Sequence, residues 1–278
     1  MGNSSAFGYP IDIMRVTWFA AALAISGAVT LRSEIHDVLK SAQIEASLAK
    51  VKGSLIIHQR PNFSISLGSQ EGGTGALETH DGADEVLFIR RGSGALTLEN
   101  RKYDLSSGDV INIKRNTPHR LDAPSGRIEY AAVRIVPIRE GRAPSGIRPA
   151  PRIMPDVLRA SEIDQTFAKF ESNQPIHSAP NFTMNYVIYS GHAGPWEAHR
   201  GCVDIYFLKI GTATSQLGGQ IRNAKEESAG EIRGDGVTGA RRYSVGPGDI
   251  VVIPRDTAHH MDPTSAKLGY LLLKVWAE

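Results

Sequence analysis

The chain contains two short segments in which acidic residues and histidines are spaced closely enough to act together. In the first segment, Glu78 and His80 are two residues apart, so on an extended strand their side chains point to the same face. The pair Asp81-Gly82 predicts a turn, and Glu85 follows it at the start of an apolar strand. Two carboxylates and an imidazole can therefore converge inside a small barrel, as a metal site or a polar pocket.

The second segment repeats the first at an offset of 119 residues. It has Glu197 and His199 in place of the first Glu-x-His pair, and Asp204 in place of the later glutamate. Between residues 37–92 and 156–211, 18 of 56 aligned positions are identical. The agreement at a fixed offset is too extensive for chance, so the chain is a tandem duplication.

Downstream, the repeat continues at an offset of 140 residues, which aligns His119 with His259. The second copy therefore carries 21 extra residues (140 − 119), located between Gly211 and Tyr243. This Gly-rich and charged insertion is predicted to be a long loop. Long loops in compact domains are often lids or binding elements; the alternatives are a solvated excursion and a subunit contact.

The duplication predicts two domains, over residues 37–136 and 155–278, each long enough to bury its own core. The Pro- and Arg-rich residues 137–154 are predicted to link them. Basic and acidic residues are interspersed at a net charge of +2, with no Lys/Arg-rich run, so nothing in the sequence indicates a nucleic-acid partner. Cys202 is the only cysteine, which excludes an internal disulfide and a cysteine-based zinc cluster.

Residues 1–36 lie outside the repeat. Residues 16–31 form an uncharged apolar run that follows Arg15 and contains small residues at positions 26–28. This order of charge, apolar core and small residues predicts a signal peptide and a periplasmic or secreted location. The alternatives are an uncleaved membrane anchor and a packed helix of a cytoplasmic protein. We also expect that the protein can form a homodimer, because exposed barrel sheets often pair.

Apolar residues at helical spacing predict one short amphipathic helix at the start of each copy, over residues 42–52 and 161–170. A capping box is expected at residues 161–164. The rest of each copy alternates short apolar runs with Gly, Asn, Asp and Pro turn signals. The sequence therefore predicts an all-β fold, as a sandwich or jelly roll.

The spacing of the glycines and the polar residues resembles that of the cupin superfamily. The segment with this spacing in the first copy runs Gly72, five residues, Glu78-x-His80, four residues, Glu85, six residues, Gly92. It is similar to the first cupin motif, and residues 191–211 repeat it without a gap. The second cupin motif is recognisable before His119 and before His259. The resemblance covers the chain from about residue 37 onward and implies two tandem cupin-type jelly-roll barrels, each preceded by a short helix.

The resemblance also implies a set of metal ligands. Cupins hold a metal with a His-x-His pair, a glutamate a few residues later and a histidine from the second motif. The positions of the last three ligands are occupied by His80, Glu85 and His119 in the first copy and by His199, Asp204 and His259 in the second. The sequence departs from the family at the first histidine, which is Glu78 in one copy and Glu197 in the other.

Two imidazoles with one or two carboxylates and no thiolate suit a hard or borderline divalent ion such as Mn²⁺, Fe²⁺, Zn²⁺ or Ni²⁺. If one carboxylate stays off the metal, open positions allow oxygenase chemistry or, on a redox-inert ion, isomerase or lyase chemistry on a small organic molecule. The spare carboxylate, Glu78 or Glu197, is then the expected catalytic base. The alternatives are a non-catalytic barrel that binds a sugar or another small ligand, and a cluster that has lost its metal.

Other polar residues near the motifs are expected to lie outside the site. His260 should point away from His259 and be a surface residue. Cys202 is expected to be a small buried side chain rather than a nucleophile. Arg115 and Arg255 are either ligands for an anionic substrate or, more commonly for such positions, surface charges in turns.

Overall fold

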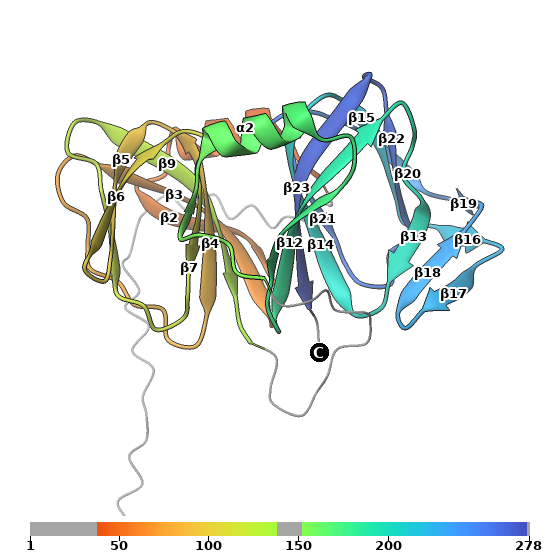
Figure 1. Cartoon of the computed structure of the whole chain (residues 1–278), viewed down its shortest axis with the longest axis horizontal. Coiled ribbons are helices and arrows are strands. Elements are labelled where there is room, and N and C mark those ends of the chain that lie inside the picture. Colours follow the sequence, from red (N-terminus) through yellow and green to blue (C-terminus); the bar gives the residue numbers. More distant parts are fainter. Residues whose placement is uncertain (1–37, 138–151, 277–278) are drawn as a thin grey trace, which may run out of the picture. The chain divides into compact units, whose positions relative to one another are not determined.

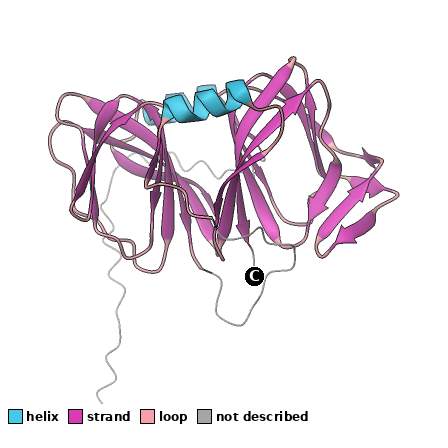
Figure 2. Cartoon of the chain, in the orientation of Figure 1, coloured by secondary structure: helices cyan, strands magenta, loops and turns pink. Residues whose placement is uncertain are grey.

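The structure is a computed structural model that describes residues 38–137 and 152–276 (Figure 1). These residues form strands and turns, together with two short helices (Figure 2). The predicted signal peptide lies outside the described residues, as do residues 138–151 of the predicted linker. Within the described ranges, no helix has the length and apolar character needed to cross a membrane.

The first barrel is built from two antiparallel sheets. Its strands are β2 (Gly53–Gln59), β3 (Phe63–Glu71), β4 (Asp84–Arg91), β5 (Ser93–Leu98), β6 (Arg101–Ser106), β7 (Val110–Ile113), β8 (His119–Asp122), β9 (Arg127–Ile135) and β10 (Val157–Leu158). One sheet has the order β10-β7-β4-β9-β3-β2 and the other has the order β6-β5-β8.

The second barrel repeats this architecture. Its strands are β1 (Val38–Leu39), β11 (Gln174–Ser178), β12 (Phe182–Ser190), β13 (Trp196–His199), β14 (Cys202–Ile210), β15 (Ala213–Leu217), β20 (Arg241–Val245), β21 (Ile250–Ile253), β22 (His259–Pro263) and β23 (Lys267–Trp276). The sheet β1-β21-β14-β23-β12-β11 has the same order as its counterpart in the first barrel. The expected all-β fold with two jelly-roll barrels is therefore present.

Each copy of the repeat contributes its first short strand to the other barrel. β1 pairs with β21, with Val38 opposite Val251, and β10 pairs with β7, with Val157 opposite Ile111. Both exchanged strands belong to the Asp-Val-Leu segments that are identical in the two copies. The exchange extends each large sheet by one strand taken from the other repeat.

A short helix follows each exchanged strand, and an aspartate of the opposite barrel caps it. These helices are α1 (Ser41–Leu48) and α2 (Ala160–Lys169). Asp249 accepts a hydrogen bond from the backbone N–H of Ser41 at 2.7 Å, and Asp109 accepts one from that of Ala160 at 2.8 Å. A carboxylate at this position satisfies a free N–H group and interacts favourably with the helix dipole.

The start of α2 differs from the expected capping box at residues 161–164. The helix begins one residue earlier, at Ala160, and the Glu162 carboxylate accepts a hydrogen bond from the backbone N–H of Arg159 at 3.2 Å. The predicted capping box at residues 161–164 was therefore wrong by two residues, because the observed box spans residues 159–162. The cause is tertiary, because Asp109 of the first barrel already holds the N–H of Ala160.

The largest hydrophobic core lies between the two barrels. It contains Val86 and Phe88 of β4 and Phe207 of β14, and the two phenylalanine rings stack with their centroids 3.6 Å apart. Leu87 and Ile89, which alternate with these residues, face the interior of the first barrel instead. A strand with two buried faces is apolar throughout. The barrels thus share a core in addition to the separate ones that the sequence predicted.

The insertion of the second copy forms strands, and the prediction of a long loop was wrong. These strands are β16 (Gln220–Arg222), β17 (Lys225–Ser228), β18 (Glu231–Gly234) and β19 (Gly236–Thr238). β18 pairs with β13, and the sheet has the order β17-β18-β13-β22-β15-β20 (Figure 1). The insertion therefore lies beside the strand that carries Glu197 and His199.

Candidate metal centres

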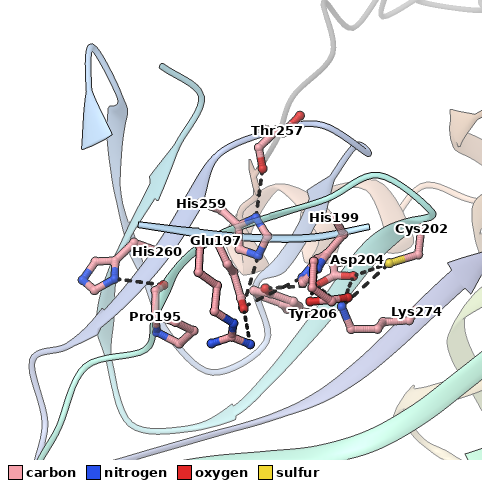
Figure 3. Close-up of polar contacts among 12 residues, drawn as sticks. Pro195, Glu197, His199, Cys202, Asp204, Tyr206, Thr257, His259, His260 and Lys274 are labelled. Atoms are coloured by element: carbon pink, nitrogen blue, oxygen red, sulfur yellow. Dashed lines mark hydrogen bonds and ion pairs between the residues drawn. The ribbon is translucent and has the colours of Figure 1, made fainter. Parts of the chain in front are cut away.

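The second barrel brings three metal-binding side chains together on neighbouring strands. Glu197 and His199 alternate on β13, so both point inward, and His259 on β22 lies directly opposite Glu197. Glu197 Oε1 is 3.5 Å from His259 Nε2 and 3.9 Å from His199 Nε2. The three ligand atoms lie within 4.8 Å of one another (Figure 3). The expected convergence of the acid and the two imidazoles is thus present.

The two imidazoles are buried and direct their Nε2 atoms to this point, and His199 Nε2 also lies 3.4 Å from Asp204 Oδ2. The side chains of His199 and His259 are 6% and 4% exposed. Within the described residues, neither Nε2 atom makes a well-aligned hydrogen bond. A buried polar atom without a partner costs free energy and is uncommon in native proteins. The arrangement therefore suits a ligand that both nitrogens share.

The outer nitrogen of each imidazole is held by an acceptor. His259 Nδ1 donates a hydrogen bond to the Thr257 carbonyl at 2.9 Å, and His199 Nδ1 lies 2.9 Å from Glu231 Oε2 (Figure 3 shows the contact with Thr257). A proton on Nδ1 leaves Nε2 as the ligand atom, and such second contacts fix the ring orientation in metal sites. The Thr257 contact thus fixes the His259 ring with Nε2 directed to the site, while Glu231 lies close to His199 Nδ1 without a well-aligned hydrogen bond.

The second acidic residue of this barrel, Asp204, forms an ion pair with Lys274. Lys274 Nζ lies 3.0 and 3.2 Å from the two carboxylate oxygens, and the two residues are cross-strand neighbours on β14 and β23. Burial alone would raise the pKa of Asp204, but the Lys274 ammonium and the His199 imidazole hold it far below its usual range. Asp204 is therefore an ionised carboxylate whose charge is already balanced.

Charges around His199 favour its protonated form when no metal is bound. Burial alone would lower the pKa of this imidazole, but Asp204 and Glu231 together raise it to about 9. On the opposite side, Arg233 binds Glu197 Oε2 at 3.1 Å and leaves Oε1 directed toward the histidines. Glu231 and Arg233 both belong to the insertion, which therefore contributes directly to the site.

The first barrel assembles the equivalent residues around an arginine. Arg134 Nε donates to Glu85 Oε1 at 2.7 Å, and its Nη2 lies 3.0 Å from His80 Nε2. His80 Nε2 is also 3.1 Å from Glu85 Oε2. Glu85 and Arg134 are cross-strand neighbours on β4 and β9, as Asp204 and Lys274 are in the second barrel. The guanidinium thus lies among the donor atoms of this barrel.

The remaining residues of the first site are less enclosed. His119 Nε2 lies 3.7 Å from Glu85 Oε2, and the Glu78 carboxylate, 54% exposed, lies 3.8 Å from His80 Nε2. Glu78, Glu85, His119, Tyr130 and Arg134 all line a cavity of about 160 Å³. Burial and the nearby Glu85 and Glu78 raise the pKa of Tyr130 to about 12, so this phenol stays neutral. The first site is a polar pocket with a cation already in place.

The structure brings together all the predicted site residues, but it distributes the carboxylates differently from the expectation. In each barrel, the atoms that converge are those of the Glu-x-His pair and the second-motif histidine, namely Glu78, His80 and His119, and Glu197, His199 and His259. The later acids, Glu85 and Asp204, are each held by a cation. The cations themselves, Arg134 and Lys274, were not predicted. The offset of 140 residues aligns them and is the signal that could have found them.

Other expectations about single residues had mixed outcomes. His260 points away from the site, as expected, but it is buried and stacks on Trp196 at 3.7 Å, so the prediction of a surface residue was wrong (Figure 3). Cys202 is buried, as predicted, and burial raises the pKa of its thiol. Arg115 and Arg255 are half-exposed in turns.

Part of the first barrel matches a known protein family. Residues 68–133 match the family model described as Cupin domain. An uncharacterized protein of Methanocaldococcus jannaschii is 37% identical over 46 residues, which cover 16% of this chain and 37% of the relative's length.

Solved structures extend the likeness to both barrels. A cupin 2 conserved barrel domain protein from Leptotrichia buccalis has a TM-score of 0.60 and 14% identity over 88% of this chain and 98% of its own. A salicylate 1,2-dioxygenase from Pseudaminobacter salicylatoxidans has a TM-score of 0.63 and 9% identity over 90% of this chain and 88% of its own. At these identities the likeness shows the fold. Residues 68–133 thus match a cupin family model, and the chain as a whole has the fold of two cupin-type barrels.

Proposed function

We propose that the second barrel binds one divalent metal ion through Glu197, His199 and His259, and that the protein is a metal-dependent enzyme acting on a small organic molecule. One observation carries this proposal. Two buried imidazole nitrogens without well-aligned partners point, together with Glu197 Oε1, to a single position. The Arg233 guanidinium lies nearest to the other oxygen of this carboxylate, Oε2, at 3.1 Å. A divalent cation would satisfy all three atoms at once.

The donor set indicates the class of metal. Two imidazoles and one carboxylate suit Mn²⁺, Fe²⁺, Zn²⁺ or Ni²⁺, and three protein ligands leave coordination positions open. When bound, such an ion supplies Lewis acidity or, if it is redox-active, a site for O₂. Oxygenase and isomerase or lyase chemistry both fit this site. The fold shared with a salicylate 1,2-dioxygenase supports the first of these classes.

In this proposal, the chain's own residues position the ligands and keep competing charges away. Glu231 and Thr257 orient the two imidazoles, and Arg233 orients Glu197. Lys274 holds Asp204 as an ion pair. Glu197 is thus the ligand carboxylate here, in the role that the cupin resemblance gave to Asp204. The predicted role of Glu197 as a catalytic base does not form part of this proposal.

Substrate would approach along the side of Glu197. The exposed fraction of the side chains rises from 4% at His259 to 14% at Glu197, 25% at Glu231 and 38% at Arg233. The more exposed side chains around the site thus belong to the insertion. On this side, the cationic Arg233 guanidinium would attract a substrate with an acidic or polar oxygen.

The first barrel favours a second function, which is binding a small polar ligand without a metal. The Arg134 guanidinium contacts Glu85 and His80, two of the expected metal ligands, and would compete with a metal ion for them. Hydroxyl and amide side chains line the cavity beside it, namely Ser54, Ser66, Ser69, Gln70 and Tyr130. A cavity with such groups suits a hydroxylated molecule such as a sugar, which hydrogen-bonds in several directions.

Metal stoichiometry tests the proposal. Protein stripped with chelator and dialysed against Mn²⁺ or Zn²⁺ should retain one ion per chain by mass spectrometry of the elements. His259→Ala should abolish retention, while the matched variant His119→Ala in the first barrel should leave it unchanged. Retention that is lost with His119→Ala and kept with His259→Ala would place the metal in the wrong barrel. No retained metal in the parent protein would overturn the proposal.

A further inference from the structure

A cavity lies where the two barrels meet, outside both candidate centres. We call it the junction cavity; it has a volume of about 210 Å³. Its lining includes Arg90 and Lys209, and these two residues occupy equivalent positions in the two copies at the offset of 119 residues. The stacked rings of Phe88 and Phe207 also line it. Each barrel therefore contributes one basic side chain to the same cavity.

Arg90 is fully engaged by its surroundings. Its guanidinium donates to the Gly248 carbonyl at 2.9 Å, lies 3.4 Å from the Ser41 hydroxyl and binds Glu45 at 2.8 Å. Arg91 binds the other oxygen of the Glu45 carboxylate, also at 2.8 Å. One carboxylate thus balances two guanidinium groups, so this side of the junction cavity keeps an excess positive charge.

Lys209 lacks counterparts of the Ser41 and Glu45 side chains that contact Arg90. The offset of 119 residues aligns Ser41 with Ala160, which has no hydroxyl, and Glu45 with Asp164, which is one methylene shorter. In the described part of the chain, no carboxylate oxygen lies within 4.0 Å of Lys209 Nζ. Burial lowers the pKa of Lys209, and the nearby Asp164 and Asp109 oppose this shift only in part. Within the described residues, this lysine is thus a cation without a direct ion pair in the wall of a cavity.

The two aspartates of the junction cavity do not neutralise this charge, because each already has partners. Asp109 accepts hydrogen bonds from the N–H of Ala160 and from Arg159, and Asp249 accepts them from the N–H of Ser41 and from Lys40. Each side chain is only 4% exposed. Both carboxylates therefore serve the helix ends rather than Lys209.

We propose that the junction cavity binds a small oxyanion, a carboxylate or an inorganic phosphate, with Lys209 as its principal contact and Arg90 as the second positive group. The volume limits the ligand, because drug-sized molecules occupy pockets of about 300–1,000 Å³. Ser107 lies in the same wall, but its hydroxyl already donates to the Arg90 carbonyl at 2.8 Å, so the two basic side chains are the expected contacts of the anion. The site differs from the proposed metal centre in position, residues and ligand.

Titration calorimetry with two probes tests the proposal. Inorganic phosphate and malonate are each titrated into the full chain in chloride buffer at constant ionic strength. At least one should bind saturably at one anion per chain, and the probe that binds more tightly identifies the oxyanion class. Lys209→Met should weaken this binding at least tenfold, while Lys102→Met, which removes an exposed lysine on β6, should leave it unchanged.

Further variants separate this site from the metal centre. Lys209→Met removes no ion pair, so its urea midpoint should equal or exceed that of the parent protein, and Lys209→Arg should restore anion binding. His259→Ala should bind the anion as the parent does. Saturable binding of neither probe by the parent, or equal binding by Lys209→Met, would overturn the proposal. Binding that is lost in His259→Ala and kept in Lys209→Met would place the anion at the metal centre and equally overturn it.

Discussion

Replacing Lys274 with methionine should strongly destabilise the metal-free protein. Methionine keeps most of the side-chain volume but leaves the Asp204 carboxylate, 2% exposed, without the ammonium group that contacts both of its oxygens. Removing one partner of a buried ion pair typically costs about 3–5 kcal/mol. His199 Nε2, 3.4 Å from Asp204, remains as a partial counter-charge. The expected loss is therefore at the lower end of this range, about 3 kcal/mol.

Urea denaturation of the chelator-treated protein at neutral pH measures this loss as a lower midpoint at an unchanged slope. The double variant Asp204→Leu/Lys274→Met should recover most of the stability, because both buried charges are then absent. The matched variant Arg134→Met should cost less than about 1 kcal/mol, since that guanidinium is 44% exposed and solvent can replace it. A loss below about 1 kcal/mol for Lys274→Met would refute the view that this pair controls the charge of the site.

Three further predictions concern the two sites. Because His199 has a pKa of about 9 and must lose its proton to bind a metal, the association constant should rise about tenfold per pH unit between about pH 7 and 8.5; calorimetry showing no dependence on pH would contradict this. Arg134→Leu removes the guanidinium from the first barrel, so retained metal should rise from one ion per chain to two, and an unchanged ratio would mean that Arg134 does not block that site. The Cys202 thiol is buried and its pKa is raised, so it should react with a thiol reagent only after unfolding; full labelling of the native protein within minutes would show that the segment opens.

The fold was largely predictable because its signals are local. Alternating apolar runs, turn residues and the spacing of two motifs predicted both barrels, and helical spacing predicted the helices before them. The exchanged strands β1 and β10 were not predicted, since two-residue strands leave no periodic pattern. The sequence predicted a loop for the insertion because its residues are polar. They form strands only because one sheet is available to pair with them. The pairing of the insertion with β13 depends on the rest of the barrel.

The metal-binding residues were predictable in type, but the sequence did not reveal which carboxylate is free. That depends on Arg134 and Lys274, which lie 49 and 70 positions from Glu85 and Asp204 in the sequence and meet them only across paired strands. Similarly, Glu231 contacts His199 only because the insertion extends the sheet. Charge compensation is a tertiary property, and it decides which acid can bind a metal.

Anomalous X-ray diffraction from crystals of protein loaded with Mn²⁺ or Zn²⁺ tests the central claim most directly. We expect one anomalous peak per chain, within bonding distance of Glu197 Oε1, His199 Nε2 and His259 Nε2, while Lys274 remains on Asp204. A peak in the first barrel alone, or a peak bound by Asp204 with Lys274 displaced, would contradict the assignment of the metal and of its ligand carboxylate.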